Sequence, residues 1–312
     1  MEILIVGGAG EVGRHLATTF SQRGHRVTII DRAPRPSWLD QNLTLAYARE
    51  DISETTTIVD RVRSKDLIIN LAWSFADDPH IIFEEDIKGH TNLLEAASSA
   101  GVCSFIYAST ATVYGRAVTH PVTEMHPCLV GEARKPLYAL GKYTAEELCR
   151  YYDKSKNLPV TIFRFWWAFG RSIGGSHLRD LIRKALNNQP LEMVHGAGGT
   201  FVTMDDIASA MLLAAERPVA SGPIYNLGSF FITWEEIARI IVHLTESNSP
   251  MRLIPPEQWR GPAFLNEVWD LDWSKAGSDL GFRPTSSMDS MLSVFTDALK
   301  QCIAGVKEDL VK

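Results

Sequence analysis

The chain begins with the stretch that decides its fold, MEILIVGGAGEVG, at residues 1–13. The apolar run Ile3–Val6 has the length of a buried strand, and it stops at a cluster of glycines. Helical periodicity follows directly over Glu11–Arg23. A strand that turns through glycines into a helix predicts the first unit of a parallel α/β sheet.

The same alternation continues along the chain, with apolar runs of strand length separated by segments of helical period. Strands are expected at Ile3–Val6, Arg26–Ile30, Thr44–Tyr47, Leu67–Leu71, Ser104–Ala108, Val160–Phe163 and Ile224–Asn226. Helices are expected at Glu11–Arg23, Ser53–Arg63, Ile81–Ala100, Leu137–Lys156, Leu178–Asn187, Asp206–Glu216 and Thr233–Thr245. This pattern predicts an α/β fold with a doubly wound parallel sheet of the Rossmann type.

The alternation is regular up to about residue 165, and beyond it helices predominate and prolines interrupt the chain. We therefore predict a dinucleotide-binding Rossmann domain over residues 1–165, with a later segment at about 200–228 returning to it. Residues 166–312 are expected to form a smaller, mostly helical substrate-binding lobe.

The composition excludes several classes of protein. The chain has 312 residues, of which 45% are hydrophobic and 22% charged, and its net charge is −6. These values are typical of a globular protein and argue against nucleic acid or an anionic membrane as a partner, so a small molecule or a protein is expected. No apolar run reaches the roughly 18 residues of a membrane span, and no cleavable leader is evident, so we expect a cytoplasmic protein.

The four cysteines, Cys103, Cys128, Cys149 and Cys302, are widely spaced and form no C-x-x-C pair. A zinc knuckle and a redox-active cysteine pair are therefore not indicated, and free thiols are expected. No histidine pair has a spacing that predicts a metal site, so none is assigned.

Gly7, Gly10 and Gly13 are three apart, and their spacing indicates a phosphate-binding loop. Such glycines allow a tight turn, let the backbone approach a pyrophosphate and let the helix pack on the strand, while the helix N-terminus offers free N–H groups. Asp31 ends the second predicted strand, where a carboxylate accepts hydrogen bonds from ribose hydroxyls. This favours NAD, although Arg32 and Arg35 close to it leave NADP open as the alternative, because either could pair with the additional phosphate.

Tyr138 and Lys142 are four residues apart near the start of a predicted helix, so their side chains share one face. A phenol with a pKa near 10 becomes a useful acid or base when a cation stabilises its phenolate. Tyr152 and Lys156 repeat the spacing further along, where a solvated surface pair is expected. Tyr138 is preferred because the hydroxyls that end the strand Ser104–Ala108 are expected to point into the same crevice.

These motifs together resemble the extended short-chain dehydrogenase/reductase family, and especially its NAD-dependent, UDP-glucose 4-epimerase-like branch. The resemblance rests on the glycine loop, Asp31, Asp51-Ile52, Asn70-Leu71-Ala72, the stretch 109–115 (STATVYG), and Tyr138 with Lys142. It implies that Thr110 helps to bind the reacting oxygen and that Tyr138 donates or accepts the proton. It also implies that Lys142 holds the nicotinamide ribose and lowers the tyrosine pKa.

The resemblance also implies the remaining contacts. Cofactor contacts are expected from Gly7, Gly10, Glu11, Val12, Gly13, Asp31, Arg32, Asp51, Ile52, Leu71, Ala72, Ser109, Tyr138, Lys142 and Phe165. Substrate contacts are expected from Trp73, Ser74, Thr110, Ala111, Thr112, Trp166, Trp167 and His177. The two adjacent indoles either form a stacking platform for a sugar ring or pack the junction between the lobes. A homodimer is implied, through the helices at Ile81–Ala100 and Leu137–Lys156.

Departures from the family pattern narrow the expected chemistry. Ala111 and Thr112 stand where dehydratases carry Asp-Glu, which argues against dehydration and decarboxylation. Trp167 stands at a phosphate-contacting Asn position, and residues 196–206 hold no arginine clamp. The favoured function is epimerisation of a sugar or sugar nucleotide by hydride transfer at a secondary carbinol. The alternatives are an NAD(P)-dependent dehydrogenase or ketoreductase on a non-nucleotide substrate and, less favoured, a non-catalytic dinucleotide sensor.

Overall fold

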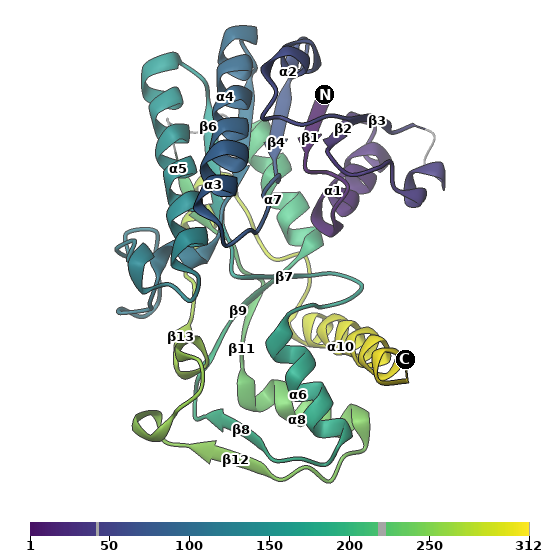
Figure 1. Cartoon of the computed structure of the whole chain (residues 1–312), viewed down its shortest axis with the longest axis vertical. Coiled ribbons are helices and arrows are strands. Elements are labelled where there is room, and N and C mark those ends of the chain that lie inside the picture. The colour runs from purple at the N-terminus through teal and green to yellow at the C-terminus, as the bar shows by residue number, and fades with distance from the viewer. Residues whose placement is uncertain (42–43, 218–222, 312) are drawn as a thin grey trace.

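A seven-stranded parallel sheet forms the centre of the fold. The structure is a computed structural model that describes residues 1–41, 44–217 and 223–311. The strand order is β10-β6-β5-β4-β1-β2-β3, so the chain winds outward in both directions from β1 and β4. The prediction of a doubly wound parallel sheet is therefore confirmed (Figure 1).

The bounds of these elements follow the predicted ranges closely. The strands are β1 Glu2–Val6, β2 Arg26–Asp31, β3 Ala46–Arg49, β4 Leu67–Asn70, β5 Ser104–Ala108, β6 Val160–Arg164 and β10 Ile224–Asn226. The helices that pack on them are α1 Glu11–Gln22, α2 Thr55–Val62, α4 Lys88–Ala100, α5 Pro136–Lys156 and α7 Met204–Glu216. Only β3 is displaced, by two residues, because its pairing with β2 matches Thr28 with Ala46 and Asp31 with Arg49.

Alternate residues of the central strands face two separate hydrophobic cores. Ile3 and Ile5 of β1 belong to the core that α1 and α7 cover, and Leu4 and Val6 belong to the core covered by α2, α4 and α5. All four side chains are at most 1% exposed. Burial on both faces explains why these strands are continuously apolar in sequence.

The predicted helix Ile81–Ala100 is divided in the structure. A short turn, α3 (Pro79–Ile81), leads into a π-helical segment, η2 (Ile82–Ile87), which continues directly into α4. The carboxylate of Asp78 accepts a hydrogen bond from the backbone N–H of His80 and so caps the start. Turns of π-helix are often found at functional sites, because they rotate side chains out of the regular helical stripe.

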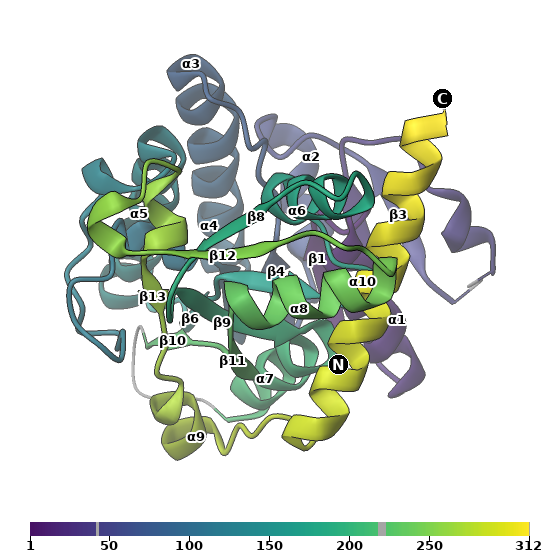
Figure 2. The ribbon, with the colours of Figure 1, turned by 90° about the horizontal axis from the view of Figure 1, so that it is seen from below.

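The second lobe contains two small sheets that the sequence did not predict. One consists of β7 (Trp167–Phe169), β9 (Gly198–Thr203), β11 (Phe230–Thr233) and β13 (Val268–Trp269), and the other of β8 (Leu191–Val194) and β12 (Met251–Ile254). The helices of this lobe are α6 Ser176–Leu186, α8 Trp234–Thr245 and α10 Met288–Val311, whereas α9 Ser274–Leu280 packs on α7 and β10 of the first domain. Neither α9 nor α10 was predicted. Figure 2 shows α8 and α10 packed beside these strands. Residues 218–222 of the segment expected to return to the first domain lie outside the described residues.

The expectations about membrane-spanning segments and about the cysteines concern the whole fold. No helix within residues 1–41, 44–217 and 223–311 is both long enough and apolar enough to cross a membrane. All four cysteines are free, with Cys149 and Cys302 buried and Cys103 exposed.

A buried ion pair joins α5 to the sheet. Arg164, the last residue of β6, donates from Nε to Oε1 of Glu146 on α5 at 2.9 Å, and its Nη2 contacts Oε2 of the same carboxylate. The two side chains are 1% and 0% exposed. The Ser109 hydroxyl, at the end of β5, also donates to Glu146. Two strands and one helix are therefore held at fixed relative positions by one charged network.

We predict that Arg164→Met lowers the free energy of unfolding by about 3–5 kcal/mol, because it leaves the Glu146 carboxylate buried without its cation. Urea denaturation measures this loss. The control is Lys300→Met, which removes an exposed ion pair with Asp297 and is expected to cost about 1 kcal/mol or less. An equal effect of the two substitutions would contradict the assigned role of the buried pair.

Candidate active site

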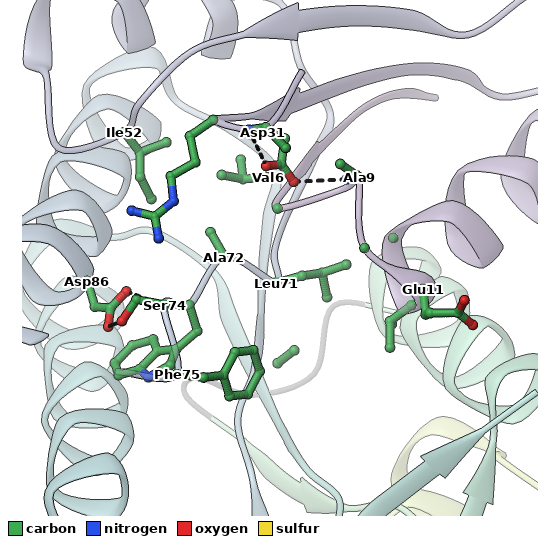
Figure 3. Close-up of a pocket in the computed structure, with 18 of the residues that line it drawn as sticks. Val6, Ala9, Glu11, Asp31, Ile52, Leu71, Ala72, Ser74, Phe75 and Asp86 are labelled. Carbon is green, nitrogen blue, oxygen red and sulfur yellow. Dashed lines mark hydrogen bonds between the residues drawn. The ribbon is translucent and has the colours of Figure 1, made fainter. Parts of the chain in front are cut away.

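A cavity of about 760 Å³ opens at the carboxyl end of the parallel sheet. Its walls come from the segments that follow β1, β2, β3, β4, β5 and β6, and from the first turns of α5. Figure 3 shows side chains from several of these segments converging on it. This is the edge at which open parallel sheets bind ligands.

The glycine loop forms one wall of the cavity. Gly7 has a φ of +77°, and an added Cβ there would lie 2.5 Å from the backbone nitrogen of Ala72. An added Cβ at Gly13 would lie 2.4 Å from the Cα of Gly8, so only glycine lets α1 pack this closely on the loop. At Gly10 the nearest atom is 3.9 Å away, which leaves space beside the backbone. Helix α1 begins at Glu11 without a side-chain cap, and its free N–H groups suit a pyrophosphate.

Asp31 is fixed at the end of β2 by two backbone hydrogen bonds. Its Oδ2 accepts from the N–H of Ala9 and its Oδ1 from the N–H of Ala33, both at 2.9 Å (Figure 3). The carboxylate therefore lies beside the glycine loop, and each oxygen keeps a lone pair that ribose hydroxyls could use. The other predicted cofactor contacts that line the cavity are Gly7, Gly10, Glu11, Val12, Gly13, Arg32, Asp51, Ile52, Leu71, Ala72, Ser109, Tyr138, Lys142 and Phe165.

Lys142 lies at the inner end of the cavity. Its Nζ donates to the carbonyl oxygen of Ala108 at 2.7 Å and lies 4.5 Å from the ring centroids of both Trp73 and Tyr107. Burial lowers the pKa of Lys142 to about 7, although the negative charges of Glu146 and Asp86 oppose the shift. A pKa in this range is what a group that takes part in proton transfer near neutral pH requires.

Tyr138 and Thr110 line the same part of the cavity. Burial raises the pKa of Tyr138 to about 12, while its hydrogen bond with Thr110 lowers it. Burial dominates here, and Lys142 is not among the groups that shift this pKa. The lowering of the tyrosine pKa by Lys142 thus stays a prediction about the loaded enzyme.

Two aromatic rings, those of Trp73 and Phe75, pack against Tyr138, and only Trp73 was predicted to lie here. The ring of Phe75 stacks on it with centroids 5.7 Å apart and an interplanar angle of 17°, and Trp73 contacts it edge-on at 6.3 Å. Phe75 was not predicted, and its φ of +58° is rare for an aromatic residue. Ser74 lines the cavity, but its N–H and hydroxyl both donate to the carboxylate of Asp86, at 2.8 and 2.6 Å (Figure 3).

The remaining predicted substrate contacts separate into two groups. Thr110 and Trp166 line the cavity, whereas Ala111, Thr112, Trp167 and His177 are not among the described residues that line it. Trp167 stacks on Phe201 at 5.4 Å and donates from its indole nitrogen to the carbonyl of Gly174. Its packing inside the second lobe favours the structural alternative for this residue.

His177 packs edge-on against Trp234 in the same lobe, with ring centroids 4.9 Å apart. The expectation that Tyr152 lies on a solvated surface was wrong. Tyr152 is 6% exposed, and its hydroxyl donates to Glu95 of α4 at 2.8 Å, because α4 and α5 pack side by side.

The NAD dependent epimerase/dehydratase family model matches residues 3–228. A relative from Bacillus cytotoxicus, UDP-N-acetyl-alpha-D-glucosaminuronate decarboxylase, is 32% identical over 82% of this chain and 84% of its own length. The chain therefore belongs to the NAD-dependent epimerase/dehydratase family, a branch of the extended short-chain dehydrogenases/reductases. This confirms the predicted family, its enzymatic character and NAD as its cofactor.

Solved structures support the same assignment. The UDP-glucuronic acid 4-epimerase of Bacillus cereus, in complex with NAD, is 25% identical with a TM-score of 0.77, over 97% of this chain and 100% of that one. A dTDP-glucose 4,6-dehydratase from Streptomyces venezuelae shares the fold at 23% identity and a TM-score of 0.76, over 99% of this chain and 97% of that one. Decarboxylases, epimerases and dehydratases thus all resemble the chain, and the residues of its site must distinguish among them.

We predict that Gly10→Ala and Gly13→Ala affect the protein differently. At Gly10 a Cβ meets no protein atom within 3.8 Å, so folding is retained while NADH affinity falls at least about tenfold, or 1.4 kcal/mol. At Gly13 the Cβ collides with the backbone of Gly8, so the melting temperature falls as well. Thermal unfolding and NADH fluorescence titration measure the two effects. Wild-type affinity in both variants would disprove the role of the loop.

Proposed function

We propose that the protein is an NAD-dependent epimerase that acts on a sugar or sugar nucleotide by hydride transfer at a secondary carbinol. The observation that carries this proposal is that Thr110, Tyr138 and Lys142 line one cavity together with the glycine loop. A proton-transfer group and a dinucleotide site then share one cavity, which hydride chemistry requires.

The proposed mechanism assigns one task to each side chain. Thr110 orients the carbinol oxygen of the substrate by hydrogen bonding, and Tyr138 takes its proton on oxidation and returns it on reduction. Protonated Lys142 lies one helical turn along α5 and stabilises the phenolate. Bound NAD supplies the hydride acceptor. Trp73 and Phe75 exclude water from the face of the Tyr138 ring that they cover.

The residues after Thr110 support epimerisation over elimination. Ala111 is buried and apolar, and Thr112 shares a hydrogen bond with Thr110 at 2.9 Å, so neither offers a carboxyl group as an additional acid or base. A dehydratase or decarboxylase needs a further acid–base group at this point of the site. The similarity to such relatives is compatible with this proposal, because proteins that share a fold can carry out different reactions.

A dehydrogenase or ketoreductase acting on a non-nucleotide substrate is the second candidate. It is favoured by the aromatic lining that Trp73, Phe75 and Trp166 provide near Tyr138. Such a surface suits a flat apolar substrate as well as the apolar face of a sugar. The two candidates differ in whether the reduced cofactor leaves the protein.

We predict that Tyr138→Phe lowers turnover at least about 100-fold, because it removes the proton-transfer group. NADH affinity and the melting temperature are expected to stay at wild-type values, since the ring and its packing are retained. The measurement is proton NMR of UDP-glucose, UDP-glucuronate and UDP-N-acetylglucosamine incubated with the enzyme. Tyr151→Phe, at a half-exposed position of the same helix, is the matched control. Turnover by Tyr138→Phe within twofold of this control would contradict the mechanism.

A homodimer is also proposed, with α4 and α5 of two copies forming a four-helix interface. The two helices lie side by side at the surface of the first domain (Figure 1), and α5 exposes Leu140 and Tyr151. Light scattering at micromolar concentration should give about twice the monomer mass of 34.7 kDa. A monomer mass under these conditions would overturn this proposal.

A further inference from the structure

An ion pair connects opposite walls of the cofactor cavity. Arg32 directly follows β2, and Glu85 belongs to the π-helical segment η2, 53 residues further along the chain. Nη1 of Arg32 donates to Oε2 of Glu85 at 2.6 Å, and both residues line the cavity. Neither the hydride chemistry nor the glycine loop accounts for this contact.

The position of Asp31 explains why Arg32 pairs with Glu85. Asp31 is adjacent in sequence, but backbone N–H groups of Ala9 and Ala33 hold its two oxygens at 2.9 Å each. The carboxylate is therefore fixed towards the glycine loop. Arg32 turns instead towards Glu85, a carboxylate that the π-helical turn brings to the cavity wall.

Charge at this end of the cavity is unbalanced. Among the described residues that line the cavity, Arg32 and Lys142 are the basic ones, and Lys142 is buried at the catalytic end. The acidic residues that line it are Glu11, Asp31, Glu50, Asp51, Glu85 and Asp86. At the end of the cavity near Asp31, Arg32 is therefore the basic residue among the described lining residues. Its guanidinium is paired with Glu85.

This arrangement bears on the choice between the two nicotinamide dinucleotides. NADP differs from NAD by a phosphate on the adenosine ribose, which would carry a charge of about −1.5 to −2 beside Asp31. Arginine is the residue best suited to bind such a phosphate. Because Nη1 of Arg32 is engaged by Glu85, a phosphate would have to share the guanidinium with this carboxylate, which would also repel it.

We propose that Glu85 is a cofactor-selecting residue, which holds the Arg32 guanidinium away from the ribose 2′-phosphate and so favours NAD over NADP. This inference concerns the choice of dinucleotide and does not depend on which sugar is the substrate. Asp31 alone would discriminate by repulsion, whereas Glu85 also competes with the phosphate for the compensating cation. The preference for NAD over NADP therefore depends in part on Glu85, a residue that need not contact the phosphate itself.

Two other arginines lie near this end of the cavity, and the test must separate them from Arg32. Nε of Arg49 donates to the carbonyl of Arg32 at 3.1 Å, and Arg35 lies 3.6 Å from Asp40. Neither is among the described residues that line the cavity. An effect that passes through Arg32 must therefore disappear when Arg32 itself is replaced.

The experiment measures NADH and NADPH affinities by fluorescence titration at one fixed ionic strength. In Glu85→Gln, NADPH affinity relative to NADH should rise on the order of fivefold, the scale on which an exposed ion pair competes with another partner. The matched control is Glu84→Gln, on the same segment, which changes the net charge equally. The Glu84 side chain is 78% exposed and does not line the described cavity, so its affinity ratio should not change.

A double variant, Glu85→Gln with Arg32→Met, assigns the gain to the arginine. The gain in NADPH affinity relative to NADH should be lost in this variant. The proposal is overturned if Glu84→Gln shifts the ratio as much as Glu85→Gln, if Glu85→Gln shifts nothing, or if the gain persists in the double variant. These titrations use no sugar, so a failed epimerase assay leaves their result intact.

Discussion

The buried pair of Glu146 and Arg164 is the interaction on which the site depends. Helix α5 carries Tyr138, Lys142 and Glu146 on successive turns. The contact between Glu146 and Arg164 therefore also fixes the positions of Tyr138 and Lys142 relative to the sheet. An ion pair without solvent is stable only when its hydrogen bonds are complete, and Ser109 contributes one of them. The same carboxylate favours the protonated form of Lys142. The ion pair therefore positions Tyr138 and Lys142 along α5, and its carboxylate opposes the larger effect of burial on the Lys142 pKa.

The network around this pair reaches the later part of the chain. Arg164 lies over the ring of Tyr114 at 4.8 Å, and the Tyr114 hydroxyl donates to Oδ1 of Asn226 on β10 at 2.7 Å. The side-chain Nδ2 of Asn226 donates to the backbone carbonyls of Val122 and Asp272. The end of the sheet, the loop after β5 and the segment before α9 are thus connected through a few polar side chains.

The features of the fold and the site that could be predicted from the sequence are those that depend on residues close together in the chain. Alternating strand and helix periods, the glycine loop and the Tyr138–Lys142 spacing are local patterns, and they located the parallel sheet and most of the cavity lining. What was missed depends on tertiary contacts. Phe75 covers Tyr138 because Asp86 holds Ser74, and the sequence gives no signal for that turn. The short strands of the second lobe are likewise defined by pairing rather than by periodicity.

The central claim is that this site returns hydride to its substrate and so regenerates its own NAD in every turnover. Denaturing extraction of the purified protein, followed by absorbance and mass analysis of the released molecules, tests this claim most directly. An epimerase is expected to release about one NAD or NADH per chain, because its cofactor has no need to leave. Protein that is purified empty and exchanges NADH rapidly with solution would contradict the claim and favour a dehydrogenase or reductase.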